Sequence, residues 1–161
     1  MIIRKATLAD VEAAHKIYES AKEFMHSSGN PNQWTGEYPS GSDVKSGIAN
    51  GTSYVCVDGD EVIATFYFGI GDDPTYKVIY DGEWKNALPY AVVHRIAVKH
   101  RGKGILGFVL DECFKMYSNL KIDTHTDNIP MQRALKKSGF EYCGIIHLAN
   151  GDERLAYQRI C

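Results

Sequence analysis

Apolar positions along the chain recur at two different spacings, which predict amphipathic helices alternating with short strands. Apolar residues from Val11 to Met25 follow one another at spacings of three and four, and Thr7 with Asp10 matches a capped helix start. Rows of apolar residues four apart predict a strongly apolar helix from Ile105 to Tyr117. Two shorter helices are expected over residues 44–50 and 129–138.

Runs rich in β-branched and aromatic residues lie between these helices and predict the strands of a sheet. The strands are expected over residues 2–5, 54–57, 62–68, 90–98, 120–124, 140–148 and 154–160. Asp58-Gly59-Asp60 and Asn150-Gly151-Asp152 each separate two such runs, which is typical of hairpins. Residues 69–88 are expected to form an irregular insertion. The alternation of elements indicates one α/β (α+β) domain over residues 1–161.

Composition and charge narrow the function classes. The chain has 161 residues, 44% of them hydrophobic, and a formal net charge of −2, so neither a nucleic-acid-binding surface nor a disordered chain is indicated. No apolar run approaches the roughly 20 residues of a membrane span, and the start lacks the pattern of a secretory signal. Four scattered cysteines without a CxxC pair favour reduced thiols and a cytoplasmic location. Both a monomer and a homodimer are compatible with the sequence.

The segment most informative about chemistry is a strand, a basic glycine-rich turn and a helix. His94–Val98 is followed by Lys99-His100-Arg101-Gly102-Lys103-Gly104 and then by the helix that starts at Ile105. Glycines allow close approach to the backbone, and the unpaired amides and dipole of a helix start attract anions, so a pyrophosphate suits this turn. Neither the Walker pattern nor the dinucleotide fingerprint is present. The alternative is an ordinary turn with solvated cations.

This segment resembles the GCN5-related N-acetyltransferase (GNAT) superfamily. The resemblance is carried by Arg-Gly-Lys-Gly-Ile at 101–105 after Ile-Ala-Val at 96–98, and by Asn128 with Lys-x-x-Gly-Phe at 136–140. It implies an acyl-CoA N-acyltransferase-like fold, with a mixed, mainly antiparallel sheet of about six to seven strands and about four flanking helices. It also implies acetyl-coenzyme A as the co-substrate.

The resemblance further implies which residues hold the cofactor. Pantetheine is expected along Ile96, Ala97 and Val98, whose main chain bonds it like an added strand, and Asn128 is expected to contact the same arm. The pyrophosphate is expected on Arg101, Gly102, Lys103, Gly104, Ile105, Leu106 and Gly107.

Three features depart from the family pattern. Leu106 stands where a small residue is usual, so its side chain is expected either to crowd the phosphate or to turn inward. The turn between Val98 and Arg101 is about two residues shorter than is common. Leu135 occupies the position at which many members carry a tyrosine that serves as general acid.

An amine that attacks a thioester must first lose a proton, because alkylamines have a pKa of about 10. His94 is our candidate for the base, since an imidazole titrates near neutral pH and a histidine precedes the same strand in arylalkylamine acetyltransferases, which this segment resembles. Strand alternation predicts that His94, Ile96 and Val98 share one face of the sheet. A histidine satisfied by a backbone carbonyl is the alternative. An amide near Ala97 or Val98 is the expected oxyanion donor.

Other side chains are weaker candidates. The general acid is expected to be Tyr142, Cys143, His125 or water, and Asp127 accompanies His125. Trp34 and Tyr38 are candidates for the wall of an acceptor pocket, because aromatic walls suit apolar or cationic amines. Tyr80, Trp84 and Tyr90 are alternatives for that wall, and Glu37, Asp72 and Asp73 are candidates for attracting a cationic acceptor. No metal site is expected, since no close ligand spacing recurs.

The leading hypothesis is therefore transfer of an acetyl group from acetyl-coenzyme A to a primary amine by direct attack in a ternary complex. The acceptor is expected to be a small molecule, with polyamines, amino acids, antibiotics and protein N-termini as classes to consider. The first alternative is an acetyl-coenzyme A-binding sensor or interaction module without turnover. The second is a nucleotide-binding enzyme that uses the 101–104 turn.

Overall fold

The protein, described over residues 1–161 by a computed structural model, is built on one mixed sheet of seven strands. The strands lie in the order β1-β2-β3-β4-β5-β7-β6, and every neighbouring pair is antiparallel except β4 with β5. The strands are β1 (Ile2–Lys5), β2 (Ser53–Asp58), β3 (Glu61–Ile70), β4 (Ala91–Val98), β5 (Asn119–Thr124), β6 (Glu141–His147) and β7 (Glu153–Ile160). The mixed, mainly antiparallel sheet expected from the sequence is confirmed.

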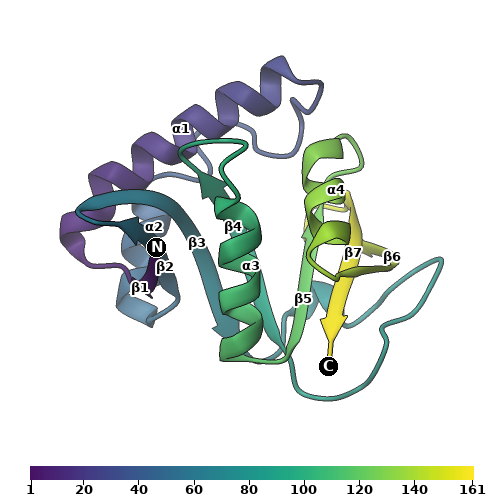
Figure 1. The fold of residues 1–161 in the computed structure, drawn as a ribbon. Helices are drawn as coiled ribbons and strands as arrows, with labels where there is room; N and C mark the ends of the chain where they lie inside the picture. The colour runs from purple at the N-terminus through teal and green to yellow at the C-terminus, as the bar shows by residue number, and fades with distance from the viewer.

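Four α-helices cover the two faces of the sheet (Figure 1). The helices are α1 (Val11–Ser27), α2 (Gly41–Asn50), α3 (Ile105–Met116) and α4 (Ile129–Lys137), and two 3-10 turns precede α1 and follow β3, η1 (Leu8–Asp10) and η2 (Pro74–Tyr76). Helices α3 and α4 lie on one face, and α1 and α2 pack on the other. None of these helices is both long and apolar enough to cross a membrane.

Two of the helix starts show the same local chemistry. Thr7 and Asp10 form the capping box that the sequence predicts before α1, with the Asp10 carboxylate accepting from the Thr7 amide at 2.7 Å. Ser40 and Asp43 form a second one, with 2.8 Å from the Ser40 amide to the Asp43 carboxylate. This second box starts α2 at Gly41, three residues before the predicted helix.

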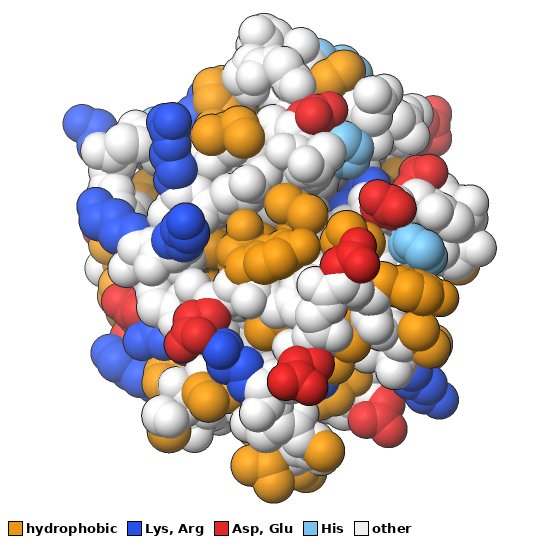
Figure 2. Space-filling view, turned by 90° about the vertical axis from the view of Figure 1, so that its right-hand side faces the viewer, with side chains coloured by type: hydrophobic (Ala, Val, Ile, Leu, Met, Phe, Trp, Pro, Cys, Tyr) orange, Lys and Arg blue, Asp and Glu red, His pale blue; other side chains and the backbone are white.

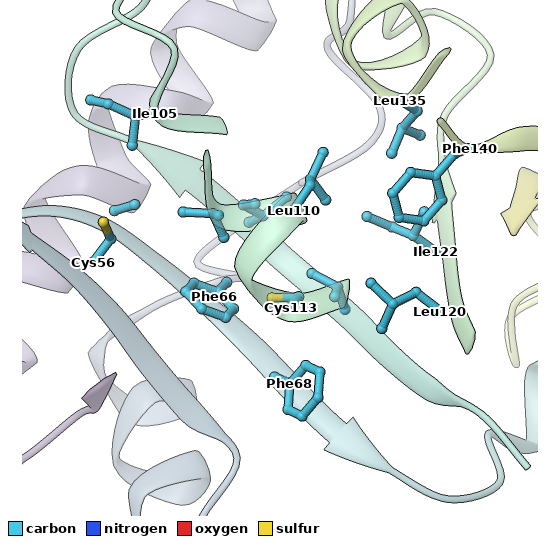
Figure 3. Close-up of a cluster of buried hydrophobic side chains, with 14 of the residues drawn as sticks. Cys56, Phe66, Phe68, Ile105, Leu110, Cys113, Leu120, Ile122, Leu135 and Phe140 are labelled. Atoms are coloured by element: carbon cyan, nitrogen blue, oxygen red, sulfur yellow. The ribbon is translucent and has the colours of Figure 1, made fainter. Parts of the chain in front are cut away.

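The main core lies between the sheet and helices α3 and α4 (Figure 3). Phe66 and Phe68 of β3 point toward Leu110 and Cys113 of α3, and all four are buried. Residues from β5, α4 and the start of the β6 segment extend the cluster, namely Leu120, Ile122, Leu135 and Phe140. This core fixes α3, and thereby the glycine-rich turn in front of it, against β3 and β4.

Strands β4 and β5 separate soon after they meet. They pair only at Ala91 with Leu120 and at Val92 with Lys121, and Figure 1 shows the strands diverging from this point. The six residues of β4 after Val92 therefore have no strand partner on their β5 side. Main-chain groups along that edge have no strand to bond and suit pairing with another extended chain.

A bulge in β4 overturns one prediction about its side chains. Tyr67 of β3 pairs with His94, whereas Thr65 pairs with Ala97, so Arg95 and Ile96 together oppose one residue of β3. Arg95 has a φ of 51°, a left-handed conformation that a side chain makes costly. The extra residue moves His94 to the face opposite Ile96, which packs in the α3 core. The prediction that His94 and Ile96 share a face is wrong for this reason.

Candidate active site

A cavity of about 920 Å³ lies beside the glycine-rich turn, between α1, β4, α3 and α4. All of the predicted cofactor residues except Lys103 line it: Ile96, Ala97, Val98, Arg101, Gly102, Gly104, Ile105, Leu106, Gly107 and Asn128. Its wall combines the unpaired half of β4 with the start of α3. We refer to it as the cofactor cavity.

The turn that opens this cavity has the geometry of an anion site. Gly104 caps α3 with a φ of 73°, and Gly102 has the same φ, so both positions are left-handed. The first intrahelical bond is donated by the Phe108 amide to the Gly104 carbonyl at 3.1 Å. The preceding amides of α3 thus have no partner within the helix. The Arg101 guanidinium lies 3.7 Å from the centre of the Phe24 ring, which positions its charge at the mouth of the turn.

The bulky residue in the family motif is accommodated by turning inward. Leu106 is partly buried and packs against the main core, while it also contributes to the cavity wall. A Cβ placed on the following Gly107 would meet only the Ser138 hydroxyl oxygen, at 3.9 Å. The Leu106 side chain is therefore shared between the core and the cavity wall.

A second cavity, of about 520 Å³, opens on the other side of β4. We call it the acceptor cavity. Trp34 and Tyr38, the predicted wall residues, both line it, and so do Asp72 and Asp73. The two cavities share Met25, Ile96 and Met131 in their walls. They therefore meet where β4 and β5 have separated.

His94 lies in the acceptor cavity between two carboxylates. Its Nε2 is 2.8 Å from Asp73 Oδ2, and its Nδ1 is 3.6 Å from Asp123 Oδ1. The Tyr76 hydroxyl donates to the same Asp123 oxygen at 2.6 Å. The imidazole is thus bonded to a side chain, Asp73, rather than to the backbone carbonyl of the alternative interpretation.

The carboxylate beside His94 is held in its charged form. Burial alone would raise the pKa of Asp73, but hydrogen bonds from His94 and from the Thr75 hydroxyl and amide outweigh burial and lower this pKa to about 2. Burial and the neighbouring Asp123 raise the pKa of the Tyr76 hydroxyl well above its usual value. The ionised Asp73 therefore orients the imidazole of His94.

The main-chain bulge next to His94 is fixed by a buried tyrosine. The Tyr18 hydroxyl donates to the Arg95 carbonyl at 2.8 Å, and Tyr18 is 1% exposed. Burial raises the pKa of Tyr18 to about 12, so the hydroxyl remains a donor. Helix α1 thereby holds the part of β4 at which the two cavities meet.

The structure places the predicted acid candidates away from both cavities. Tyr142 is exposed on β6, where it packs edge-on against Tyr157, and Cys143 is buried with its Sγ directed at the Glu141 carbonyl. Burial raises the pKa of the Cys143 thiol. Neither residue lines a cavity. The geometry gives no support to either as the acid.

Several other candidates also lie outside the site. His125 and Asp127 interact with each other after β5 and line neither cavity, and the Glu37 carbonyl accepts from Lys22. The aromatic alternatives are structural: Tyr80 stacks on His147, Trp84 donates to the Tyr76 carbonyl, and Tyr90 accepts from the Asp73 amide.

Figure 2 shows the side of the molecule with β6 and the 71–90 segment, where hydrophobic side chains gather at the centre among scattered charges.

Asn128 lines the cofactor cavity but its side chain is engaged within the protein. Its Oδ1 accepts from the Met131 amide at 3.1 Å and caps α4. Its Nδ2 donates to Gln33 Oε1 at 2.8 Å. Asn128 thus connects α4 to the loop that carries Trp34, and it borders the cofactor cavity as a structural residue.

Sequence reasoning missed residues whose neighbours in space are distant in sequence. Asp123 and Tyr76 join His94 only through tertiary packing, and no spacing pattern connects them. Asp123, a charge within a short β-rich run, was the one available signal. Other missed lining residues are Phe24, Met25, Lys137 and Arg159 in the cofactor cavity, and Gln33, Tyr67, Arg95 and Arg154 in the acceptor cavity.

Comparisons with known proteins identify the family. No family model matches the sequence, and no curated protein matches it, but solved structures do. A GNAT-family acetyltransferase from Streptococcus agalactiae is 30% identical, with a TM-score of 0.91 over 99% of this chain and 95% of that chain. The chain therefore belongs to the GNAT family of acetyltransferases, and its sheet and helices match the acyl-CoA N-acyltransferase fold.

More distant structures share the fold. A ribosomal-protein-alanine N-acetyltransferase from Brucella melitensis is 19% identical, with a TM-score of 0.65 and full coverage of both chains (100% each). RimL, a ribosomal alpha-N-protein acetyltransferase solved in complex with coenzyme A, is 20% identical, with a TM-score of 0.64 over 98% of this chain and 92% of that chain.

Proposed function

We propose that this protein transfers an acetyl group from acetyl-coenzyme A to a primary amine of a small-molecule acceptor, by direct attack in a ternary complex. The observation that carries the proposal is the meeting of two cavities at Met25, Ile96 and Met131, with His94 in one and the α3 entrance in the other. A ternary complex requires two sites that open onto each other, because the amine must reach the thioester carbonyl directly.

The cofactor cavity suits a long ligand with a diphosphate. The amides at the start of α3 and the positive end of its dipole receive the diphosphate, and Arg101 and Lys137 add charge along the wall. The unpaired edge of β4 from Ile96 to Val98 offers main-chain groups to the amide bonds of a pantetheine arm. The complex of RimL with coenzyme A supports this choice of ligand by fold likeness.

His94 acts as the general base. With Nε2 donating to Asp73, the lone pair lies on Nδ1, whose 3.6 Å separation from Asp123 is too long for a strong hydrogen bond. Nδ1 takes one proton from the bound ammonium, directly or through one water, which frees the lone pair that bonds to the acetyl carbon; the second proton on nitrogen leaves to water as the amide forms. Asp73 and Asp123 then stabilise the imidazolium.

The remaining steps need little from side chains. An amide near Ala97 or Val98, on the unpaired edge of β4, donates to the oxyanion that forms on the acetyl oxygen. The carbon–sulfur bond then breaks and the thiolate departs with its electron pair. A thiol has a pKa of about 8.5, so the thiolate is a good leaving group and water suffices to protonate it. Leu135, fully buried where many relatives carry a tyrosine, is consistent with this route.

A screen for thiol release tests the proposal. Purified protein is incubated with acetyl-coenzyme A and a broad panel of primary amines, and the free thiol and the acetylated amine are both quantified. We expect at least one small amine to be acetylated in equal amount to the thiol released. Tight binding of coenzyme A without turnover across the panel would instead identify a sensor or interaction module.

A further inference from the structure

We infer that the acceptor carries a carboxylate beside its amine, and that Arg95 and Arg154 bind this carboxylate in the acceptor cavity. The inference rests on the proposed function, which it narrows to amino-acid-like zwitterions. It is drawn from two arginines in the cavity wall that the protein itself leaves without counter-ions.

Arg154 is a buried cation with no acidic partner. It lies at the start of β7 with 6% of its surface exposed, and it lines the acceptor cavity. Its guanidinium donates to the carbonyls of Glu153, at 2.9 Å, and Gln33, at 3.2 Å. None of the ion pairs in the structure includes it. Burying a guanidinium without a carboxylate is costly, so an anionic ligand there is favoured.

Arg95 is a second arginine of the same cavity without an acidic partner. Its Nε is buried and has no hydrogen-bond partner, and it too is absent from the ion pairs. The bulge and the Tyr18 bond to its carbonyl fix its backbone in a left-handed conformation. The Tyr67 ring, 5.5 Å from its Cζ, supports the guanidinium from one side. Strain and an orphaned donor together point to a ligand-binding role.

Negatively charged side chains lie in the same cavity as His94, the proposed general base. Asp72, Asp73 and Asp123 line the cavity together with His94, and Asp73 stays ionised because of its bonds to His94 and Thr75. An ammonium group is attracted to these carboxylates and deprotonated at the imidazole. A cavity lined by three acidic side chains and by two arginines outside every ion pair complements a zwitterion better than a simple amine.

The size and lining of the cavity fit one small amino acid. Its volume of about 520 Å³ lies within the usual range for small-molecule sites. Trp34, Val92, Ile122 and Leu148 give it apolar walls between the charged groups. Arginine binds carboxylates through two parallel hydrogen bonds, which fixes the orientation of the amine toward the thioester.

Matched acceptors test the inference on the wild-type protein. Each of the twenty protein amino acids is compared with its carboxamide and with the amine left after removal of the carboxylate, in the thiol-release assay. We expect the best amino acid to exceed its carboxamide and its decarboxylated amine in kcat/KM by about tenfold to a hundredfold, the range for hydrogen bonds to charged groups.

Three variants and one control locate the effect. Arg95→Gln and Arg154→Gln are each expected to remove most of this preference, by raising KM for the amino acid while leaving KM for the decarboxylated amine unchanged. Arg95→Lys should recover part of it, since charge is retained without the planar fork. Arg133→Gln, on the exposed side of α4 and outside both cavities, should change nothing. Melting temperatures and coenzyme A affinity monitor folding.

The outcomes separate this inference from the function on which it rests. If carboxamides and simple amines are acetylated as well as amino acids, or if the preference survives both glutamine variants, the inference is overturned and the acetyltransferase assignment stands. Acetylation only of peptides, and not of free amino acids, also overturns it. If coenzyme A binds but no amine is acetylated, the proposed function fails and the inference fails with it.

Discussion

The cofactor cavity and the acceptor cavity lie on two sides of the same strand and are built in opposite ways. Main-chain groups of two adjacent segments, Ile96–Val98 and the turn at 101–107, provide much of the first. Side chains from many separate parts of the chain provide the second, among them the loop after α1, β3, β4, the 71–75 segment, β5 and β7. Backbone recognition depends on conformation, whereas side-chain recognition depends on the residue at each position.

This difference explains how one side of β4 can stay constant while the other side changes. A backbone cradle tolerates substitutions such as Leu106, provided the turn keeps its left-handed glycines. In the acceptor cavity a single exchange at Arg154 or Asp73 alters the charge that a ligand meets. A shared fold therefore predicts the cofactor far better than it predicts the acceptor. The variants below test the two halves separately.

The largest effect is expected on coenzyme A affinity, from a substitution in the glycine-rich turn at 101–107. Gly104→Glu places a negative side chain at a left-handed position in front of the α3 amides, where open space surrounds the Cβ. Loss of two or three charged hydrogen bonds should lower the affinity for coenzyme A more than about a thousandfold, measured by calorimetry. Gly151→Glu, with a φ of 90° in a hairpin turn far from the cavity, is the matched control and should bind normally. If Gly104→Glu bound coenzyme A as tightly as the wild type, the diphosphate would not bind at the start of α3.

A substitution of His94 in the acceptor cavity should lower turnover without changing the affinity for coenzyme A. His94→Ala is expected to lower kcat roughly a hundredfold while leaving the dissociation constant of coenzyme A unchanged. The exposed His147→Ala is the control. A pH–rate profile with the same acidic limb in wild type and His94→Ala would exclude His94 as the base.

A smaller effect concerns stability. Asp73 has a pKa of about 2 in the folded protein and about 3.9 when unfolded, so its ionised form stabilises the fold above pH 4. Asp73→Asn should lower the free energy of unfolding by about 2 kcal/mol at pH 7, measured with urea. The difference from wild type should shrink as the pH falls from 4 toward 2. A difference that stays constant over this range would contradict the ionised assignment.

The smallest effect is expected at the bulge that separates the two cavities. Tyr18→Phe leaves the Arg95 carbonyl without its donor and should cost about 1 kcal/mol of stability. Because the bulge positions His94 and Arg95, kcat/KM should fall by more than the loss of folded protein explains. The exposed Tyr142→Phe serves as the control. Equal kcat/KM in wild type and Tyr18→Phe would show that the bulge keeps its conformation without the Tyr18 hydrogen bond.

The sequence predicted most of the residues that line one wall of the cofactor cavity, because they are contiguous in the chain. The run from Ile96 to Gly107 contains strand, turn and helix start in one stretch, and every element of the sheet was expected close to its observed bounds. The start of α2 was missed by three residues, because the Ser40–Asp43 capping box lies in a polar loop without an apolar period.

The acceptor half was predicted only in part, for a topological reason. Trp34, Tyr38 and His94 were identified by residue type, but their partners come from other elements. Strand alternation placed His94 on the wrong face, since a bulge inserts a residue that periodicity cannot show. The charge of Asp123 within a β-rich run is a weak signal and Arg154 carries none, because the significance of both depends on what packs beside them.

The most direct test of the central claim is a crystal structure of the protein with coenzyme A. We expect the diphosphate on the amides of Ile105, Leu106 and Gly107, the pantetheine arm along β4, and the sulfur atom at the junction lined by Met25, Ile96 and Met131. A sulfur atom that lies away from this junction, or a diphosphate bound elsewhere on the molecule, would contradict it.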